Sequence, residues 1–327
     1  MIDRATLLKS ALVAAAAPQP FLQPHPRWHF VFVNHAMTNP FFVPARYGIA
    51  DACSIFGVSS EWTGSTRSDP AQMVAAMHRA IKRGVDGIAV SIIDQSVFNE
   101  PTKRAIAAGI PVVAYNADGG RRNARLAYVG QDLYQAGLRF GARIVELVGE
   151  GDVVVFIATP GQLNIQPRVD GAVDAVRDSG KPIRLRVVAS GVLIGDERKK
   201  IEQTYLRNKK LRGMFAVDAG STQSVAEVVR KYDLHRKGVR AGGYDLLPVT
   251  LRSVADGLLD FAIDQQPYLQ GFVPLQQLFL YQYSGGLVSP AETNTGLKFV
   301  TRDNVGPYLT THTRYEGSSA AEKYPVR

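Results

Sequence analysis

Short apolar segments alternate with amphipathic segments from Trp28 through most of the chain. The apolar segments have the length of β-strands, and the segments between them repeat apolar residues at the spacing of a helix. A strand such as Asp152–Ala158, which is almost entirely apolar, is typical of a parallel sheet covered on both faces. The alternation therefore predicts an α/β fold with doubly wound, parallel sheets.

The number of these strand–helix units is too large for one compact sheet, so we expect two similar lobes with a break near Val129–Asp132. Asp69 and Pro70 suit the start of a helix, and Gly57 and Gly84 suit helix ends. The expected strands are Trp28–His35, Val58–Trp62, Val85–Ile92, Ile110–Asn116, Asp152–Ala158, Ile183–Ser190, Leu211–Val217, Val239–Tyr244 and Leu259–Asp264. The expected helices are Phe41–Phe56, Asp69–Arg83, Gln95–Ala108, Asn164–Ser179, Asp196–Leu206, Thr222–Tyr232, Leu246–Asp256 and Pro267–Tyr281.

Residues 1–26 differ in character from the rest of the chain. Arg4 and Lys9 precede the apolar run Ala11–Ala17, which is too short to span a bilayer, and Pro18 follows it. This order is typical of a secretory signal peptide followed by a proline-rich linker, so we expect a periplasmic or extracellular protein. A short alanine-rich helix in a cytoplasmic protein is the alternative.

The net charge of +9 raises the question of a nucleic-acid partner. The 38 lysines and arginines are scattered along the chain and form no basic stripe interleaved with aromatic residues. We therefore expect a solvated basic surface and no nucleic acid. The single cysteine, Cys53, permits no disulfide framework.

Sequence signatures of catalysis are missing. No expected strand leads into Gly-x-Gly-x-x-Gly, and neither a P-loop nor a Gly-x-Ser-x-Gly elbow occurs. The six histidines lack the spacing of metal ligands. We expect no catalytic residue, no metal and no cofactor, and an enzyme remains an alternative because α/β sheets serve many functions.

Ligands of parallel α/β sheets bind beyond the carboxyl ends of the strands. Polar and aromatic residues are concentrated at these positions. The segment His35–Phe42 follows the first expected strand, and Asn116 and Asp118 follow the fourth. In the second half of the chain the corresponding residues are Asp218, Asp245 and Gln265.

Six short motifs occur in a fixed order along the chain. They are Asn39–Phe42 (NPFF), Asp69–Gln72 (DPAQ), Gly84–Ile88 (GVDGI), Ala108–Val113 (AGIPVV), Gly242–Asp245 (GGYD) and Ile263–Pro267 (IDQQP). In this order the chain resembles the ribose-binding-type (type I) periplasmic binding proteins of bacterial sugar ABC transporters. The resemblance extends from Trp28 to Tyr308.

The resemblance implies two lobes joined by three crossover segments, with a ligand enclosed between the lobes by a hinge motion. The crossovers are expected near Val129–Asp132, Asp264–Gln266 and Gly296–Val300. The first lobe would comprise residues 27–130 and 266–296, and the second residues 131–265 and 297–312, followed by a tail at 313–327.

The resemblance also implies which residues bind the ligand. Asn39 matches an asparagine that bonds a sugar hydroxyl, and Phe41 and Phe42 match aromatic residues that lie against the sugar ring. Arg168 matches an arginine of the second lobe, and Asp218 stands where ribose binders usually carry asparagine. The other candidates are Asp245 and Gln265, which match family residues, and His35, Trp62, Asn116 and Asp118.

Two departures bear on the ligand. Where the family often has Asp-Arg, this chain has Asn116 and Ala117, followed by Asp118. A bidentate arginine is absent there, so a monosaccharide other than ribose, or a sugar alcohol, is expected. The segment Trp62–Gly64 resembles the branch of the family that binds rhamnose, autoinducer-2 and polyols.

Most candidates also have a structural role open to them. Arg168 differs, because a buried arginine needs a specific partner. The open structural roles are core packing for Phe41 and Phe42, helix capping for Asn39 and Asp218, cover of the lobe edge for Trp62, and a loop hydrogen bond for His35.

The sequence thus predicts the substrate-binding protein of a sugar ABC transporter. Its expected partners are a small sugar or polyol and the membrane permease subunits, with a chemoreceptor as a further candidate. The alternative is a sugar-sensing effector of the lactose-repressor-like class that acts in signalling or regulation. The residues before Trp28 are rich in alanine and proline rather than shaped as a helix-turn-helix, which argues against a DNA-binding repressor.

Overall fold

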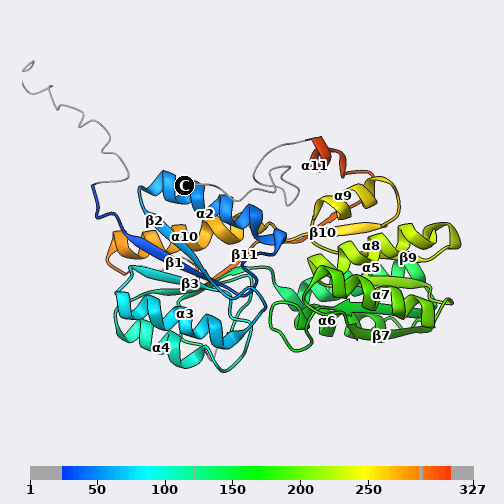
Figure 1. The fold of residues 1–327 in the computed structure, drawn as a ribbon, viewed down its shortest axis with the longest axis horizontal. Helices are drawn as coiled ribbons and strands as arrows, with labels where there is room; N and C mark the ends of the chain where they lie inside the picture. Colours follow the sequence, from blue (N-terminus) through cyan, green and yellow to red (C-terminus); the bar gives the residue numbers. More distant parts are fainter. Residues whose placement is uncertain (1–23, 121–122, 287–289, 311–327) are drawn as a thin grey trace, which may run out of the picture.

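The chain forms two lobes that lie side by side, each built on one six-stranded sheet (Figure 1). The structure is a computed structural model, and it describes residues 24–120, 123–286 and 290–310. The predicted signal peptide and the tail at 313–327 lie outside these residues. Helices cover both faces of each sheet, so the predicted α/β class with two mostly parallel, doubly wound sheets is confirmed.

The sheet of the first lobe has the strand order β11-β5-β4-β3-β1-β2, and all its neighbouring strands are parallel. Its strands are β1 (His29–Asn34), β2 (Ser59–Gly64), β3 (Gly87–Val90), β4 (Val112–Tyr115), β5 (Ala127–Gly130) and β11 (Glu292–Asn294). Its helices are η1 (Pro40–Phe42), α2 (Val43–Phe56), α3 (Pro70–Arg83), α4 (Asn99–Ala107) and α10 (Pro267–Ser284).

The sheet of the second lobe has the order β12-β10-β9-β8-β6-β7, and only β12 runs antiparallel to its neighbour, β10. Its strands are β6 (Gly151–Ile157), β7 (Ile183–Ala189), β8 (Gly213–Ala216), β9 (Arg240–Tyr244), β10 (Phe261–Asp264) and β12 (Lys298–Val300). Its helices are α5 (Leu133–Val148), α6 (Gln166–Asp178), α7 (Ile194–Arg207), α8 (Ala219–Tyr232), η3 (His235–Lys237), α9 (Pro248–Ala255) and α11 (Gly306–Thr310).

The expected strands and helices are present, and the structure adds elements that the sequence pattern did not predict. The largest is α5, whose two glycines, Gly137 and Gly141, weaken the helix signal. The others are the short strands β5, β11 and β12, the 3-10 helix η3 and the terminal helix α11, each with five residues or fewer. The expected single helix Phe41–Phe56 is instead a 3-10 turn followed by α2, and Gly57 and Gly84 end α2 and α3 in the left-handed conformation as expected.

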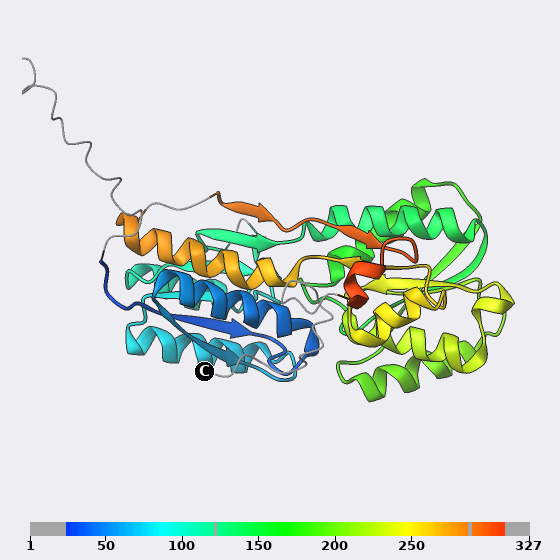
Figure 2. The same ribbon diagram turned by 90° about the horizontal axis from the view of Figure 1, so that it is seen from above.

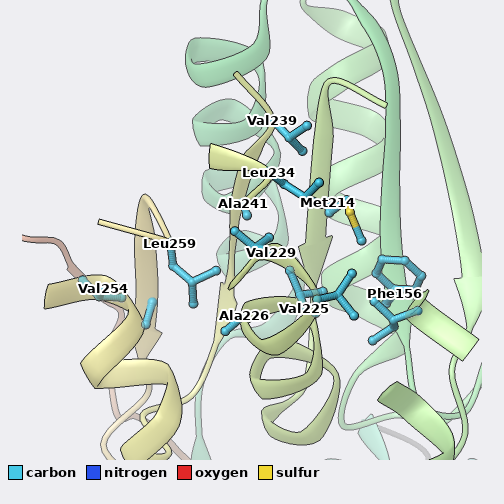
Figure 3. Packing of buried hydrophobic residues seen from close by; sticks show 14 of the residues in the cluster. Phe156, Met214, Val225, Ala226, Val229, Leu234, Val239, Ala241, Val254 and Leu259 are labelled. Atoms are coloured by element: carbon cyan, nitrogen blue, oxygen red, sulfur yellow. The ribbon is translucent and has the colours of Figure 1, made fainter. Parts of the chain in front are cut away.

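Alternate residues of each central strand face opposite layers of the core. In β1, Phe30 and Phe32 pack with α2 and α10, whereas Val31 and Val33 pack with α3 and α4. The second lobe is layered in the same way, and Figure 3 shows the face on which α8 and α9 pack. The carboxyl ends of the strands are thereby held on rigid supports.

Two helix pairs approach so closely that a side chain would not fit between them. A Cβ on Gly271 of α10 would lie 1.9 Å from the carbonyl oxygen of Ala45 in α2. In the second lobe, a Cβ on Gly137 of α5 would lie 2.5 Å from the carbonyl oxygen of Arg168 in α6. Glycine is required at both positions because of this contact, and the second contact fixes the backbone of a predicted site residue.

The chain passes between the lobes at residues 131–132, 265–266 and 295–297 (Figure 2). The first two crossings lie where they were expected. The third lies earlier than the expected Gly296–Val300, because Lys298–Val300 already pairs with β10. The strands on either side of each crossing belong to different sheets. We therefore propose the lobe limits given above, with residues 27–130 and 266–296 in the first lobe.

Candidate ligand-binding site

The carboxyl ends of the strands of the two sheets meet at the boundary between the lobes. Leu163 N, after β6, donates to Ile93 O, after β3, at 3.1 Å. Beside this bond, Asn164 Nδ2 lies 3.3 Å from His35 Nε2. Direct contacts therefore join the two lobes beside His35, one of the predicted site residues.

Arg168 is the centre of the second-lobe half of the site. Its side chain is buried, and Nη1 and Nη2 donate to Val217 O and to Gln265 Oε1, both at 2.8 Å. The guanidinium lies over the ring of Tyr244, with Cζ 4.1 Å from the ring centroid. Its Nε has no hydrogen-bond partner among the described residues, so this buried arginine retains an unused donor.

Gln265 connects this arginine to the crossovers and to the first lobe. Its Nε2 donates to Asp245 Oδ1 at 2.6 Å, and its Oε1 also accepts from Gln270 Nε2 at 3.2 Å. Gln270 Oε1 in turn accepts from Asn116 Nδ2 at 3.0 Å. One buried chain of hydrogen bonds thus runs from Asn116 in the first lobe to Asp245 and Arg168 in the second.

The backbone is unusual at the same place. Asn116, Asp245 and Gln266 adopt left-handed conformations, with φ of 64°, 75° and 58°. Such conformations are uncommon outside glycine and persist where surrounding contacts enforce them, often at functional sites. Here the left-handed residues stand directly after β4 and β9 and in the second crossover.

The two carboxyl groups of the second lobe have different surroundings. Burial raises the pKa of Asp245 to about 7, although the charge of Arg168 opposes this shift. Asp218 is half-buried and accepts from Ala158 N and Ser221 N, both at 2.9 Å. Asp218 therefore caps α8, which is the structural role that the sequence left open for it. Burial also raises the pKa of Asp218.

Aromatic residues form the first-lobe side. Phe41 and Phe42, whose ring centroids are 4.8 Å apart, are buried in one cluster with Ala219 and Leu247 of the second lobe. The ring centroids of Trp62 and Phe42 are 5.8 Å apart, and Trp62 Nε1 donates to Met37 O at 3.4 Å. The two phenylalanines are thus part of the core and of the contact between the lobes at once.

Asn39 and His35 precede these aromatics. Asn39 Oδ1 accepts from Phe41 N at 3.0 Å and begins η1, so its capping role is realised. The ring of His35 lies edge-on to Phe42, and its Nδ1 is 2.9 Å from Ser91 Oγ. Its Nε2 lies 3.3 Å from the amide nitrogen of Asn164, and burial lowers the pKa of His35 to about 4, which favours the neutral ring.

Asp118 lies away from this hydrogen-bond chain. Its carboxylate pairs with the guanidinium of Arg125, which also contacts Glu292 at 2.8 Å. Asp118 and Glu292 border a cavity of about 370 Å³ beside the crossovers, lined also by Tyr128 and Gln131. Asp118 therefore has a local partner that the sequence did not indicate.

Four site residues were missed by the sequence reasoning. Gln270 stands one helical turn after the crossover, and Asn164 stands one turn before Arg168, so spacing from predicted residues could have found both. Ser91 directly follows β3 and could have been found by its position at a strand end. Glu197, which contacts Ser221 beside Asp218, is buried within an exposed, charged stretch, and no local sequence pattern predicts its burial.

The described residues contain no group of histidine, cysteine or acidic side chains arranged to hold a metal ion. Among the same residues, no helix is long and apolar enough to cross a membrane. The candidate site consists of amides, carboxyl groups, one arginine, the imidazole of His35 and aromatic rings. Such a set can bind a neutral, polyhydroxylated molecule by hydrogen bonds and ring contacts.

Comparison with known proteins agrees with this arrangement. Residues 30–283 match the sequence profile of a family described as the periplasmic binding protein domain. The chain belongs to the periplasmic binding protein family. A relative is the xylose/arabinose-binding protein XylF of Sulfolobus acidocaldarius, which is 46% identical over 96% of this chain and 82% of the relative.

Solved periplasmic binding proteins share the fold. An ABC transporter solute-binding protein from Burkholderia graminis, in complex with D-arabinose, superposes with a TM-score of 0.81 at 24% identity, over 88% of this chain and 100% of that chain. A carbohydrate transporter protein from Acidothermus cellulolyticus, in complex with myo-inositol, gives a TM-score of 0.78 at 25% identity, over 87% and 97% of the two chains. The resemblance to this family is thus confirmed over nearly the whole described chain.

Proposed function

We propose that this periplasmic binding protein captures a monosaccharide between its lobes and delivers it to the permease of a sugar ABC transporter. Pentoses such as xylose and arabinose are the first candidates, because a relative at 46% identity is named a xylose/arabinose-binding protein. Sugar alcohols are the second. The proposal places the protein in the periplasm or outside the cell, with the permease subunits as partners and a chemoreceptor as a further one.

The observation that carries the proposal is the buried hydrogen-bond chain from Asn116 to Arg168. It has unused capacity at Arg168 Nε and Asn116 Oδ1, neither of which has a partner among the described residues. Buried polar groups are normally paired, so these atoms favour a polar ligand. A sugar hydroxyl can donate to one of them and accept from the other.

The neighbouring aromatic residues suit the other face of such a ligand. Sugars present apolar C–H groups beside their hydroxyls, and the rings of Phe41, Phe42 and Trp62 lie together at the first-lobe side. Polar groups around the hydroxyls would reject an analogue that lacks one, because a buried partner would then go unpaired. The proposed ligand contacts are Asn39, Asn116, Arg168, Asp218, Asp245 and Gln265, with His35, Phe41, Phe42 and Trp62, and with Asp118 as the outlying member.

A thermal-shift screen tests the proposal directly. Pentoses, deoxyhexoses and alditols would be compared at equal concentration with the purified protein. A ligand at 100 times its Kd stabilises the native state by about 2.7 kcal/mol, which raises Tm by several degrees. We expect this rise with xylose or arabinose, and an unchanged Tm with every compound of the panel would contradict the proposal.

Asp245→Ala should weaken sugar binding strongly. The substitution removes a charge-assisted acceptor and leaves Gln265 Nε2 without the partner that it now reaches at 2.6 Å. We expect a loss of about 1.5 to 3 kcal/mol, or roughly 10- to 150-fold in Kd, measured by isothermal titration calorimetry with the sugar found in the screen. Asp256→Ala is the matched control, because Asp256 forms an exposed ion pair with Arg230 in the same lobe. Equal affinity of the two variants would remove Asp245 from the site.

A further inference from the structure

A buried glutamate lies behind Asp218. Glu197, in the first turns of α7, is 3% exposed although the residues on both sides of it are exposed. Its carboxyl packs against the start of α8: a Cβ on Gly220 would lie 2.1 Å from Glu197 Oε2, and Ser221 Oγ donates to Oε1 at 3.4 Å. Glu197 therefore occupies the helix start that Asp218 caps.

The two carboxyl groups can share this space only if one of them carries a proton. Glu197 Oε2 has no hydrogen-bond partner among the described residues, and the carboxyl groups of Glu197 and Asp218 both contact Ser221 at the start of α8. Both oxygens of Asp218 already accept backbone N–H groups, from Ser221 and Ala158, which favours the ionised form of Asp218. The proton therefore belongs on Glu197, and burial, followed by the charge of Asp218, raises the pKa of Glu197 to about 9.

The other charges near this pair act on Asp218 rather than on Glu197. Arg168 of α6 lowers the pKa of Asp218, and Asp218 in turn raises that of Asp245, after β9. The other ionic contacts between α7 and α8 involve exposed basic side chains; they are Arg198–Glu227 at 3.4 Å and Lys231–Glu202 at 2.6 Å.

We propose that Glu197 is a positioning residue that, as a neutral acid, donates a hydrogen bond to Asp218 and holds that carboxylate in place for the ligand. Val217, which precedes Asp218, is the carbonyl partner of Arg168, so a displaced Asp218 would also disturb the arginine. The inference rests on the proposed sugar-binding function. Loss of the proton from Glu197 places two negative charges side by side and drives Asp218 out of position.

The first test is the pH profile of sugar affinity, measured by calorimetry with D-xylose and L-arabinose from pH 6 to 10.5. Wild-type affinity should fall above the pKa of Glu197, by up to about tenfold per pH unit if only the protonated form binds. Glu197→Gln, which mimics the neutral acid, should bind within about twofold of wild type at pH 7 and lose the alkaline fall. Glu202→Gln, on the same helix and in an ion pair with Lys231, should keep the alkaline fall. A persisting alkaline fall in Glu197→Gln, or a tenfold loss of its affinity at pH 7, would overturn the inference.

The second test needs no sugar and separates this inference from the proposed function. The folded-state pKa of Glu197 lies above its usual value of 4.5, so the folded state binds more protons, and the contribution of Glu197 to wild-type stability declines as pH rises from 4.5 to about 9. Glu197→Gln lacks this decline, and its Tm should gain on wild type steadily across that window. Parallel Tm curves would overturn the inference even if sugar binds, whereas failure of both pentoses to bind wild type would count against the proposed ligand alone.

Discussion

Replacing Arg168 with methionine should abolish measurable sugar binding and destabilise the second lobe. The substitution removes two hydrogen bonds of 2.8 Å, to Val217 O and Gln265 Oε1, and the contact with Tyr244. It also removes the positive charge that counteracts the effect of burial on the pKa of Asp245. Removing one member of a buried charged group costs about 3 to 5 kcal/mol, or roughly 100- to 5,000-fold in Kd if the whole loss falls on binding.

The pH dependence of this variant provides an internal check. Without Arg168 the pKa of Asp245 should rise further above its present value of about 7, so the folded state holds the Asp245 proton to higher pH. Stability of the variant should therefore decline more steeply than that of wild type as pH rises through the neutral range. Urea unfolding at pH 5 and pH 8 measures this difference.

Two further variants define what Arg168 contributes. Arg168→Lys keeps the charge but cannot reproduce both hydrogen bonds, so it should recover stability better than affinity. Arg177→Ala, on the exposed face of the same helix, should change neither by more than about 0.5 kcal/mol. Sugar binding by Arg168→Met within threefold of wild type would show that the arginine serves the fold alone.

Gly271→Ala should destabilise the first lobe although alanine is the better helix former. The added Cβ would lie 1.9 Å from the carbonyl oxygen of Ala45 and 2.9 Å from its Cα, so α2 and α10 must move apart. Overpacking of this kind costs typically about 1 to 3 kcal/mol, and here the obstacle is backbone, which cannot rotate away. Thermal or urea unfolding of the purified variant measures the loss.

Gly195→Ala is the matched control for this prediction. Gly195 lies at the start of α7, and a Cβ there would meet no atom within 4 Å. The same substitution should then be neutral or stabilising by up to about 1 kcal/mol, because it restricts the unfolded chain. If both variants unfolded alike, close packing of α2 and α10 would not be the reason for glycine at position 271.

Part of the candidate site could be predicted from the polar residues that follow the expected strands. Asn116, Asp245 and Gln265 were predicted because polar residues directly follow apolar strands, and the structure joins them in one hydrogen-bond chain. Gln270, which completes that chain, lies near the start of helix α10 rather than at a strand end. Asp118 stands two residues further along the same loop than Asn116, and it pairs with Arg125 instead of joining the chain.

The sequence by itself determined the fold class, the order of most strands and helices, and the strand ends at which a ligand site can form. These depend on periodicity and on turn residues, which act over a few positions along the chain. The tertiary structure alone decided which side chains meet, such as Arg168 with Gln265, because burial and charge depend on segments that are distant in sequence. It also decided that α5 is a helix, since the close contact of Gly137 with α6 compensates for a weak local preference.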